Sequence, residues 1–425
     1  IRGTIDVLFP NIECEYHIVD NNSKVYYESN GIHVHPGDLF FSNWRSREFE
    51  LGLSFRQIYS SICSLIRNGM NKFFPFWILR PHREAINFAK YISGVKIPPK
   101  RHAKSVELLK NIDYVIAGHN GGLDEYVCHI INELDKLNIS YGIFGSSMQP
   151  NYKEKNMLSV FEKTFKNSNF NIARNPIGYE WAIKYFPKLN FELRPDPAFG
   201  MTPTSEDEID SLIKNLKIEK FLSKKTIMIT TAEPAPITRK SFDEHTFPHQ
   251  KIVAHRKFLS EFITKIYEET DYNILFLPHT IGPDLRMDDR KISEDVIIRS
   301  KLENNSRVML LKDDLSAKEL KGIIKNAYFL LGERVHSIIG AIGVGTPFMC
   351  LGSPHDLRLK GILEIQMELG NNIYHLNYPK VDEAYNMFNN LLNNYEQEKN
   401  NLKHLNKKIK SSLLEVNHNL SEFFM

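Results

Sequence analysis

The chain has 425 residues, about three times the usual single-domain length of roughly 150, so two sizeable domains are expected. Its hydrophobic fraction of 42% and charged fraction of 25% are ordinary for a globular protein and exclude wholesale disorder or a fibrous repeat. Fifty-four Lys and Arg against 51 Asp and Glu give a net charge of +3, which does not indicate a nucleic-acid partner.

The N-terminal half contains a strongly basic stretch. Between residues 45 and 104 there are twelve Lys or Arg and three acids, and the aromatic run 73–79 is flanked by Lys72, Arg80 and Arg83. Bases around an aromatic run favour a surface that meets anionic lipid or a lipid-linked diphosphate. The alternative is a buried strand or helix whose flanking bases are solvated.

Short, continuously apolar segments recur along the rest of the chain and predict strands buried on both faces. They lie at 114–118, 141–145, 226–231, 273–278, 308–311, 328–332 and 347–351. Helices are predicted between several of them, at 124–137, at 178–186 and at 316–326, the last opened by the capping pair Ser316 and Glu319. Strands and helices in alternation predict parallel sheets in an α/β fold.

Domain boundaries follow from a predicted seam at 201–205, where a second capped helix begins at Ser205 with Glu208. We therefore expect an N-terminal domain over 1–201, a C-terminal domain over 202–380 and a helical tail over 381–425. An apolar stripe at Leu402, Leu405, Ile409, Leu413, Val416, Leu420 and Phe423 indicates that the tail packs back onto the body.

Ligands of open parallel sheets bind beyond the carboxyl ends of the strands, so the loops there are the candidate site. The first loop contains His119, Asn120, Gly121 and Gly122, whose backbone amides could approach a ligand, although a plain tight turn explains them equally. In the second, Arg174 could hold a carboxylate or phosphate with its guanidinium fork, or form an ordinary salt bridge.

A third candidate is His279 with Thr280, directly after a predicted strand. The long segment 232–255, with His245, His249 and His255, favours a lid or binding loop. No carboxylate or cysteine pattern accompanies these histidines, and the four cysteines (Cys14, Cys63, Cys128 and Cys350) show no paired spacing, so no metal site is expected.

The fourth and most informative segment is 330–347. A buried strand ends at Gly332, then Arg334, Val335, His336, Ser337 and Ile338 open a helix rich in small residues, which Gly345 ends before Pro347. A guanidinium, an imidazole and the amides of Ser337 and Ile338 at a helix N-terminus favour a polyanion. The alternative is a histidine that serves the fold alone.

At this segment the sequence resembles the polysaccharide pyruvyltransferase family, whose hallmark is an Arg, an apolar residue and a His before a small-residue helix and a Gly-Thr-Pro turn. Further family-like segments follow the same order: 113–124, 172–175, 195–199 and 277–280. The resemblance covers roughly 110–376. The family opens with a strand and a glycine turn, so we expect that the chain as given lacks its natural first strand, with the strand at 13–19 following.

The resemblance implies two Rossmann-like domains facing a cleft, as in GT-B glycosyltransferases. It implies transfer of a pyruvyl group from phosphoenolpyruvate to a sugar of a cell-surface polysaccharide or its lipid-linked precursor, without a cofactor. His336 would be the general acid. Arg174, Arg334, Val335, Ser337, Ile338, His279 and Thr280 would bind phosphoenolpyruvate, and residues 119–122 would bind the acceptor.

Two other functions stay open: a GT-B glycosyltransferase that uses a nucleotide sugar, and a non-catalytic sugar-binding protein. No stretch reaches the roughly 18 apolar residues of a membrane span and the cysteines fit a reducing compartment, so a cytoplasmic protein, in possible peripheral contact with an anionic membrane, is expected.

Overall fold

The computed structural model describes residues 16–19, 32–35 and most of 112–424. Within the last range it leaves out 119–122, 124–127, 129–130, 133, 135–137, 149–154, 235–241, 243–246 and 282–287. The basic stretch at 45–104 and the predicted acceptor loop at 119–122 therefore lie outside the described residues. β1 (Tyr16–Val19) and β2 (Ile32–His35) pair in parallel, and the first confirms part of the strand predicted at 13–19.

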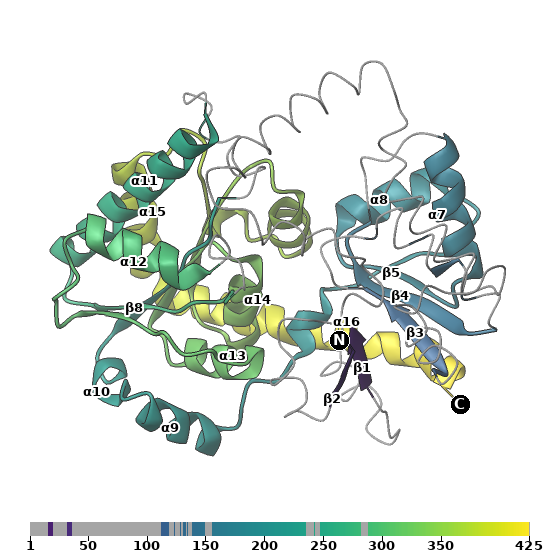
Figure 1. The fold of residues 1–425 in the computed structure, drawn as a ribbon, viewed down its shortest axis with the longest axis horizontal. Helices are drawn as coiled ribbons and strands as arrows, with labels where there is room; N and C mark the ends of the chain where they lie inside the picture. The colour runs from purple at the N-terminus through teal and green to yellow at the C-terminus, as the bar shows by residue number, and fades with distance from the viewer. Residues whose placement is uncertain are drawn as a thin grey trace, which may run out of the picture. The chain divides into compact units, whose positions relative to one another are not determined.

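The chain divides into two compact units (Figure 1). The N-terminal unit contains 13–173 and 178–192, and the C-terminal unit contains 174–177 and 193–425. The division at Glu192 comes before the predicted seam at 201–205. The reason is that the 3₁₀ helix η6 (Pro197–Gly200) contacts two helices of the C-terminal unit, α14 (Val335–Val344) and α16 (Tyr395–Phe424).

The N-terminal unit contains a four-stranded sheet in the order β3-β4-β5-β6. Its strands are β3 (Tyr114–Ala117), β4 (Ser140–Ser146), β5 (Asn171–Ala173) and β6 (Glu192–Leu193), and its helices include α7 (Lys155–Asn167) and α8 (Pro176–Tyr185). β3, β4 and β5 pair in parallel. Aromatic side chains of the two helices, among them Phe161 and Trp181, pack with Tyr141 and Ile143 of the sheet to form its core.

The C-terminal unit contains a six-stranded sheet in the order β12-β11-β10-β7-β8-β9, with every adjacent pair parallel. Its strands are β7 (Thr226–Thr230), β8 (Asn273–Phe276), β9 (Val308–Leu310), β10 (Phe329–Gly332), β11 (Phe348–Gly352) and β12 (Ile373–His375). This is the order of a doubly wound dinucleotide-type sheet, with β7 and β10 at its centre. The α/β fold with parallel sheets is confirmed.

Helices cover both faces of this sheet. They are α9 (Glu206–Asn215), α10 (Glu219–Leu222), α11 (Pro248–Glu269), α12 (Asp289–Arg299), α13 (Ala317–Lys325), α14 (Val335–Val344), α15 (Val381–Asn393) and α16 (Tyr395–Phe424). Alternate side chains of β7 lie on opposite faces of the sheet. Met228 packs with α9, α13, α14 and α16 on one face, whereas Ile227 and Ile229 pack with α11, α12 and α15 on the other. Both faces of the sheet are therefore covered by buried apolar side chains.

Two predicted helix starts are confirmed in detail. Ser205 and Ser316 cap α9 and α13, and each forms a reciprocal capping box with the Glu three residues on. The predicted end of α14 is also confirmed, because Gly345 adopts a left-handed φ of 78° that favours glycine.

The predicted tail forms two helices that cover opposite faces of the sheet. α15 contributes Phe388 to one core cluster, and α16 contributes Leu402, Ile409 and Leu413 of the predicted stripe to the other. The tail is thus part of the C-terminal unit. In the described part of the chain, no helix combines the length and apolar character needed to span a membrane.

Candidate functional site

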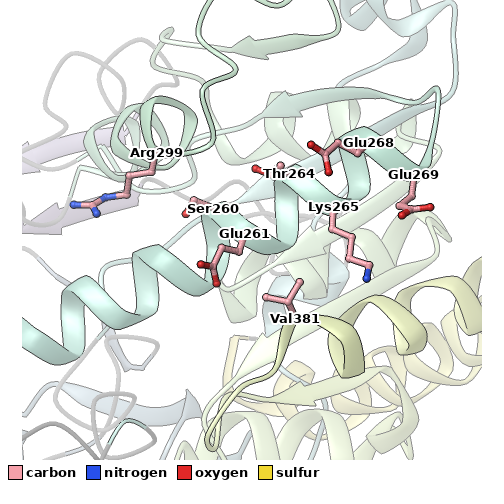
Figure 2. A pocket seen from close by; sticks show the side chains of 8 residues that line it. All are labelled: Ser260, Glu261, Thr264, Lys265, Glu268, Glu269, Arg299 and Val381. Atoms are coloured by element: carbon pink, nitrogen blue, oxygen red, sulfur yellow. The ribbon is translucent and has the colours of Figure 1, made fainter.

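A surface hollow on α11 lies away from the predicted site. Figure 2 shows that its lining includes Ser260, Glu261, Thr264, Lys265 and Glu268, on the half of α11 that leads into β8. Lys265 donates to Asp382 at 2.5 Å across it. The ligand site of a parallel sheet lies at the opposite ends of the strands, so the hollow belongs to the helical surface.

The carboxyl ends of β7 and β10 form the topological switch point of the C-terminal sheet. From β7 the chain continues towards β8 and β9, and from β10 it continues towards β11 and β12 in the other direction. Crossover helices diverge at such a point and leave a crevice for ligands. Arg334 and His336 follow β10 directly, so the structure places the most informative predicted segment at this switch point.

Arg334 is anchored by a buried carboxylate. Its guanidinium forms an ion pair with Asp289, the first residue of α12, and Nε lies 3.3 Å from the second carboxylate oxygen. The Asp289 side chain is 0% exposed, whereas that of Arg334 is 24% exposed. Burial raises the pKa of Asp289, and the Arg334 guanidinium and two backbone amides oppose that rise. Part of the Arg334 side chain therefore stays accessible while Nε and Nη2 of its guanidinium are held by Asp289.

The His279 turn is tied to the same carboxylate. One Asp289 oxygen accepts hydrogen bonds from the amides of His279 at 3.1 Å and Thr280 at 2.8 Å. Burial, followed by the charges of His336 and Arg334, lowers the pKa of His279 to about 3. His279 is therefore neutral near pH 7, and the predicted residues His279, Thr280, Arg334 and His336 are brought together.

A second buried pair lies immediately before Arg334. Glu333 accepts from the Ala232 amide at 2.9 Å, and one of its oxygens lies 2.5 Å from Nε2 of His255. His255 is on α11, which begins at Pro248, so the prediction of a loop extending to residue 255 was wrong for 248–255. His249 is on the same helix and exposed, and His245 lies outside the described residues.

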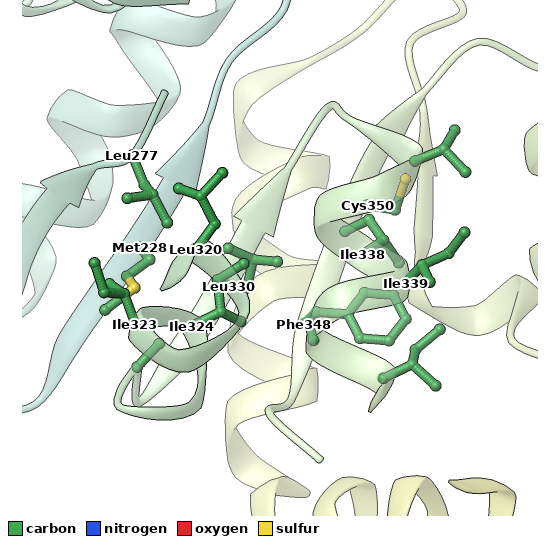
Figure 3. Packing of buried hydrophobic residues seen from close by; sticks show 14 of the residues in the cluster. Met228, Leu277, Leu320, Ile323, Ile324, Leu330, Ile338, Ile339, Phe348 and Cys350 are labelled. Atoms are coloured by element: carbon green, nitrogen blue, oxygen red, sulfur yellow. The ribbon is translucent and has the colours of Figure 1, made fainter. Parts of the chain in front are cut away.

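The first amides of α14 form hydrogen bonds within the helix. The amides of Ser337 and Ile338 donate to the carbonyl of Arg334 at 3.0 and 3.2 Å, as the first amides of a helix often do. The Ser337 hydroxyl lies 2.7 Å from that of Thr230, and Val335 and Ile338 belong to the core, where Figure 3 shows Ile338 near Cys350. Both amides therefore bond within the helix, and Val335 and Ile338 pack in the core. The contact of Val335, Ser337 and Ile338 with phosphoenolpyruvate stays a prediction.

Arg174 is buried in a salt bridge. Its side chain is 2% exposed and donates from Nη1 to Asp196 at 2.9 Å, and Asp196 is 0% exposed. The other Asp196 oxygen accepts from the amide of Ala198 and caps η6. The alternative of a salt bridge is thus the one observed, although it is buried rather than on the surface.

Sequence reasoning missed Asp289, Glu333 and Asp196. Asp288 and Asp289 stand where a helix begins, so their sequence suggests a helix cap and nothing more. Asp289 lies 45 positions before Arg334 in the sequence, so the parallel sheet is what brings the two side chains together. The Asp-Pro-Ala segment at 196–198 was noted, but its buried partner Arg174 could not be inferred from spacing.

Comparisons with known proteins give a family match and several structures of similar fold. The model of the polysaccharide pyruvyl transferase family matches residues 51–355. A search of curated proteins finds no match. Among solved structures, the UDP-GlcNAc 2-epimerase of Methanocaldococcus jannaschii is 14% identical with a TM-score of 0.51, over 91% of this chain and 88% of that one.

Two further structures show the same likeness. The UDP-GlcNAc 2-epimerase of Neisseria meningitidis, bound to UDP-GlcNAc, is 10% identical with a TM-score of 0.50, over 97% of this chain and 95% of that one. The N-terminal domain of Candida albicans trehalose-6-phosphate phosphatase is 10% identical with a TM-score of 0.50, over 100% and 93%. At these identities the likeness shows the fold, which is GT-B-like.

Proposed function

The chain belongs to the polysaccharide pyruvyl transferase family, and from this premise we propose that it transfers the pyruvyl group of phosphoenolpyruvate to two hydroxyls of a sugar. The product is a cyclic ketal, and phosphate is released. The acceptor is a sugar of a cell-surface polysaccharide or its lipid-linked precursor, modified in the cytoplasm. No metal or organic cofactor is needed for this chemistry.

The observation that carries the proposal is that Arg334 and His336, two residues apart, both lie at the switch point. Arg334 presents an accessible part of a fixed guanidinium, a group that matches phosphate and carboxylate oxygens. His336 lies in the first turn of α14, whose N-terminal dipole favours anions. A small trianion such as phosphoenolpyruvate suits a cation and a proton donor held side by side.

In the proposed reaction, His336 transfers one proton to the donor. Its imidazolium donates a proton to the methylene carbon, which leaves a cationic carbon at C2 for the first sugar hydroxyl to attack. Phosphate then departs with the electrons of the C2–O bond, and the second hydroxyl attacks C2. Of the two hydroxyl protons released, one restores His336 and the other goes to phosphate, so atoms and charge balance.

Arg334 is the residue we assign to the donor's phosphate or carboxylate, with His279 and Thr280 beside it. Arg174, by contrast, is committed to Asp196. We therefore assign Arg174 to support of the segment around η6, and its direct contact with the donor is no longer part of the proposal.

Phosphate release from phosphoenolpyruvate, screened against galactosides, glucosides and N-acetylmannosamine lipids, tests the proposal. A ligand that binds only the folded state also raises the unfolding temperature, so phosphoenolpyruvate should stabilise the protein. Stabilisation by uridine or guanosine diphosphate sugars, with none by phosphoenolpyruvate, would favour a nucleotide-sugar glycosyltransferase. Stabilisation by sugars alone, without turnover, would favour a non-catalytic sugar-binding protein.

A further inference from the structure

Two adjacent aspartates at the start of α12 have different partners. Asp288 caps the helix: it accepts from the amide of Arg290 at 3.0 Å and from its guanidinium at 2.7 Å. Asp289 instead contacts the site segments that follow β8 and β10. Both carboxylates are buried, at 5% and 0% exposure of the side chain. Their positions differ by one residue, yet only Asp289 contacts the site.

Asp289 joins two segments that are far apart in the sequence. Its Oδ2 accepts from the amides of His279 and Thr280, and the carboxylate as a whole pairs with the guanidinium of Arg334. In return the amide of Asp289 donates to the carbonyl of Thr280 at 3.0 Å. One buried side chain therefore sets the relative position of the His279 turn and of the Arg334 guanidinium.

We propose that Asp289 is a positioning residue, which directs the free part of the Arg334 guanidinium towards the donor anion and holds the His279 turn beside it. The identity of that donor rests on the proposed function. Asp289 acts through Arg334 and has no role in bond making.

The chemistry of the carboxylate explains why an amide would not replace it. A guanidinium has only donors, and Asp289 has only acceptors, so the pair is fully matched. In Asp289→Asn the amide oxygen can still accept from the His279 and Thr280 amides, but the new NH₂ group faces the donors of Arg334. The substitution therefore breaks the Nη2 contact and the ion pair of Arg334, and it leaves the His279 turn bonded.

Two measurements on the full chain test this proposal. The first is KM and kcat for phosphoenolpyruvate, in which Asp289→Asn should raise KM about tenfold or more, because small misplacement of a binding group is costly. The second needs no substrate: modification of each arginine by phenylglyoxal, followed by mass spectrometry. Asp289→Asn should speed modification of Arg334 several-fold.

Asp288→Asn is the matched control. It should leave KM and the labelling rate of Arg334 at parental values and speed the labelling of Arg290 instead. Asp289→Glu keeps the anion, and it should restore part of the affinity and of the protection of Arg334. If Asp289→Asn does not fold, Asp289→Glu takes its place as the test variant. In that variant the labelling rate of Arg334 should lie between the rate in the parent and the rate of free arginine.

The outcomes separate the two proposals. If the parent consumes phosphoenolpyruvate and Asp289→Asn leaves KM unchanged, positioning by Asp289 is overturned and the proposed function stands. If the parent neither binds nor consumes phosphoenolpyruvate, the proposed function fails. The labelling rate of Arg334 then tests the positioning role of Asp289 by itself. Faster labelling of Arg334 confined to the Asp289 variants then supports the positioning role, and an unchanged rate overturns it.

Discussion

The surroundings of His279 at the switch point hold its imidazole in the neutral form. His279 has a pKa of about 3 and stays neutral across the physiological range. It can orient a substrate by hydrogen bonding, but it cannot supply a proton from an imidazolium near pH 7. In the proposed mechanism the proton donor is therefore His336, the other imidazole of the site.

Substituting His336 tests this division of roles. His336→Gln should bind phosphoenolpyruvate nearly as well as the parent, while kcat falls about 10²-fold or more, the size of a lost general acid. Calorimetric titration and phosphate release measure the two quantities. His279→Gln is the comparison: its kcat should keep the parental pH dependence between pH 5 and 9, since His279 does not titrate there. Near-normal turnover in His336→Gln would remove that residue from the mechanism.

Arg174 and Arg194 provide a second comparison between residues of one type. Arg174 is buried with Asp196, whereas Arg194 pairs at 2.8 Å with Glu415, whose side chain is 66% exposed. Removing one partner of a buried pair leaves an uncompensated charge, which costs about 3–5 kcal/mol, and an exposed pair is worth about 0–1 kcal/mol.

Arg174→Ala should therefore lower the free energy of unfolding by about 3–5 kcal/mol in urea denaturation, and Arg194→Ala by about 1 kcal/mol or less. Donor affinity per folded molecule should be nearly unchanged in both. A stable Arg174→Ala protein that has lost its affinity for phosphoenolpyruvate would instead return Arg174 to the donor site.

At the scale of elements, a buried lysine connects α13 to the segment that enters the C-terminal unit. Lys321 on α13 donates to the carbonyls of Met201 at 2.6 Å and Phe199 at 3.3 Å. A Cβ at position 343 would lie 2.5 Å from its Nζ, so Gly343 of α14 leaves room for the lysine to pass. Burial, with a contribution from Lys410, lowers the pKa of Lys321 to about 8.

The lowered pKa of Lys321 makes the free energy of unfolding depend on pH. The unfolded chain, with a lysine pKa near 10.5, binds more protons than the folded protein between about pH 8 and 10.5, so this group makes stability rise with pH there. The difference in unfolding free energy between parent and Lys321→Met should grow across this window, by about 1.4 kcal/mol per pKa unit at most. Lys318→Met, on the exposed side of α13, should show no such growth. A flat difference for Lys321→Met would contradict the lowered pKa.

Local signals explain which elements could be predicted. The capping boxes at Ser205 and Ser316 and the glycine end of α14 depend on residues within a few positions of one another, and all three are observed. The overlong loop at 232–255 had a local signal that was overlooked, since Pro248 stands at the first turn of α11.

The contacts that could not be predicted join residues far apart in the sequence. Nothing near Arg174 indicates Asp196, and nothing near Arg334 indicates Asp289, because each pair forms only when distant segments meet. The eight-residue π-helix at Leu359–Gln366 is a further example: Gly361 there packs against Asn175, where an added Cβ would lie 3.1 Å from that side chain. The sequence thus predicts where the site lies better than it predicts which side chains are left free within it.

At the scale of the whole molecule, charge is unevenly distributed along a nearly neutral chain. The net charge is +3, although residues 45–104 contain twelve bases and three acids, so the remainder is acidic. A lipid-linked acceptor would place a diphosphate and anionic head groups near the enzyme. Each base near such a surface contributes about 1 kcal/mol, so a few acting together are enough for reversible attachment at low salt.

Charge reversal tests whether this stretch meets the acceptor's membrane. Lys72, Arg80 and Arg83 changed together to Glu should weaken sedimentation with phosphatidylserine-containing vesicles and raise the apparent KM for a lipid-linked acceptor. A short soluble glycoside should be unaffected, because it needs no membrane contact. The control changes Lys214, Lys217 and Lys220 to Glu, three exposed bases around α9 that alter the net charge equally. Equal losses in both variants would indicate net charge rather than the basic stretch, and a parent that binds no vesicles at low salt would end the hypothesis.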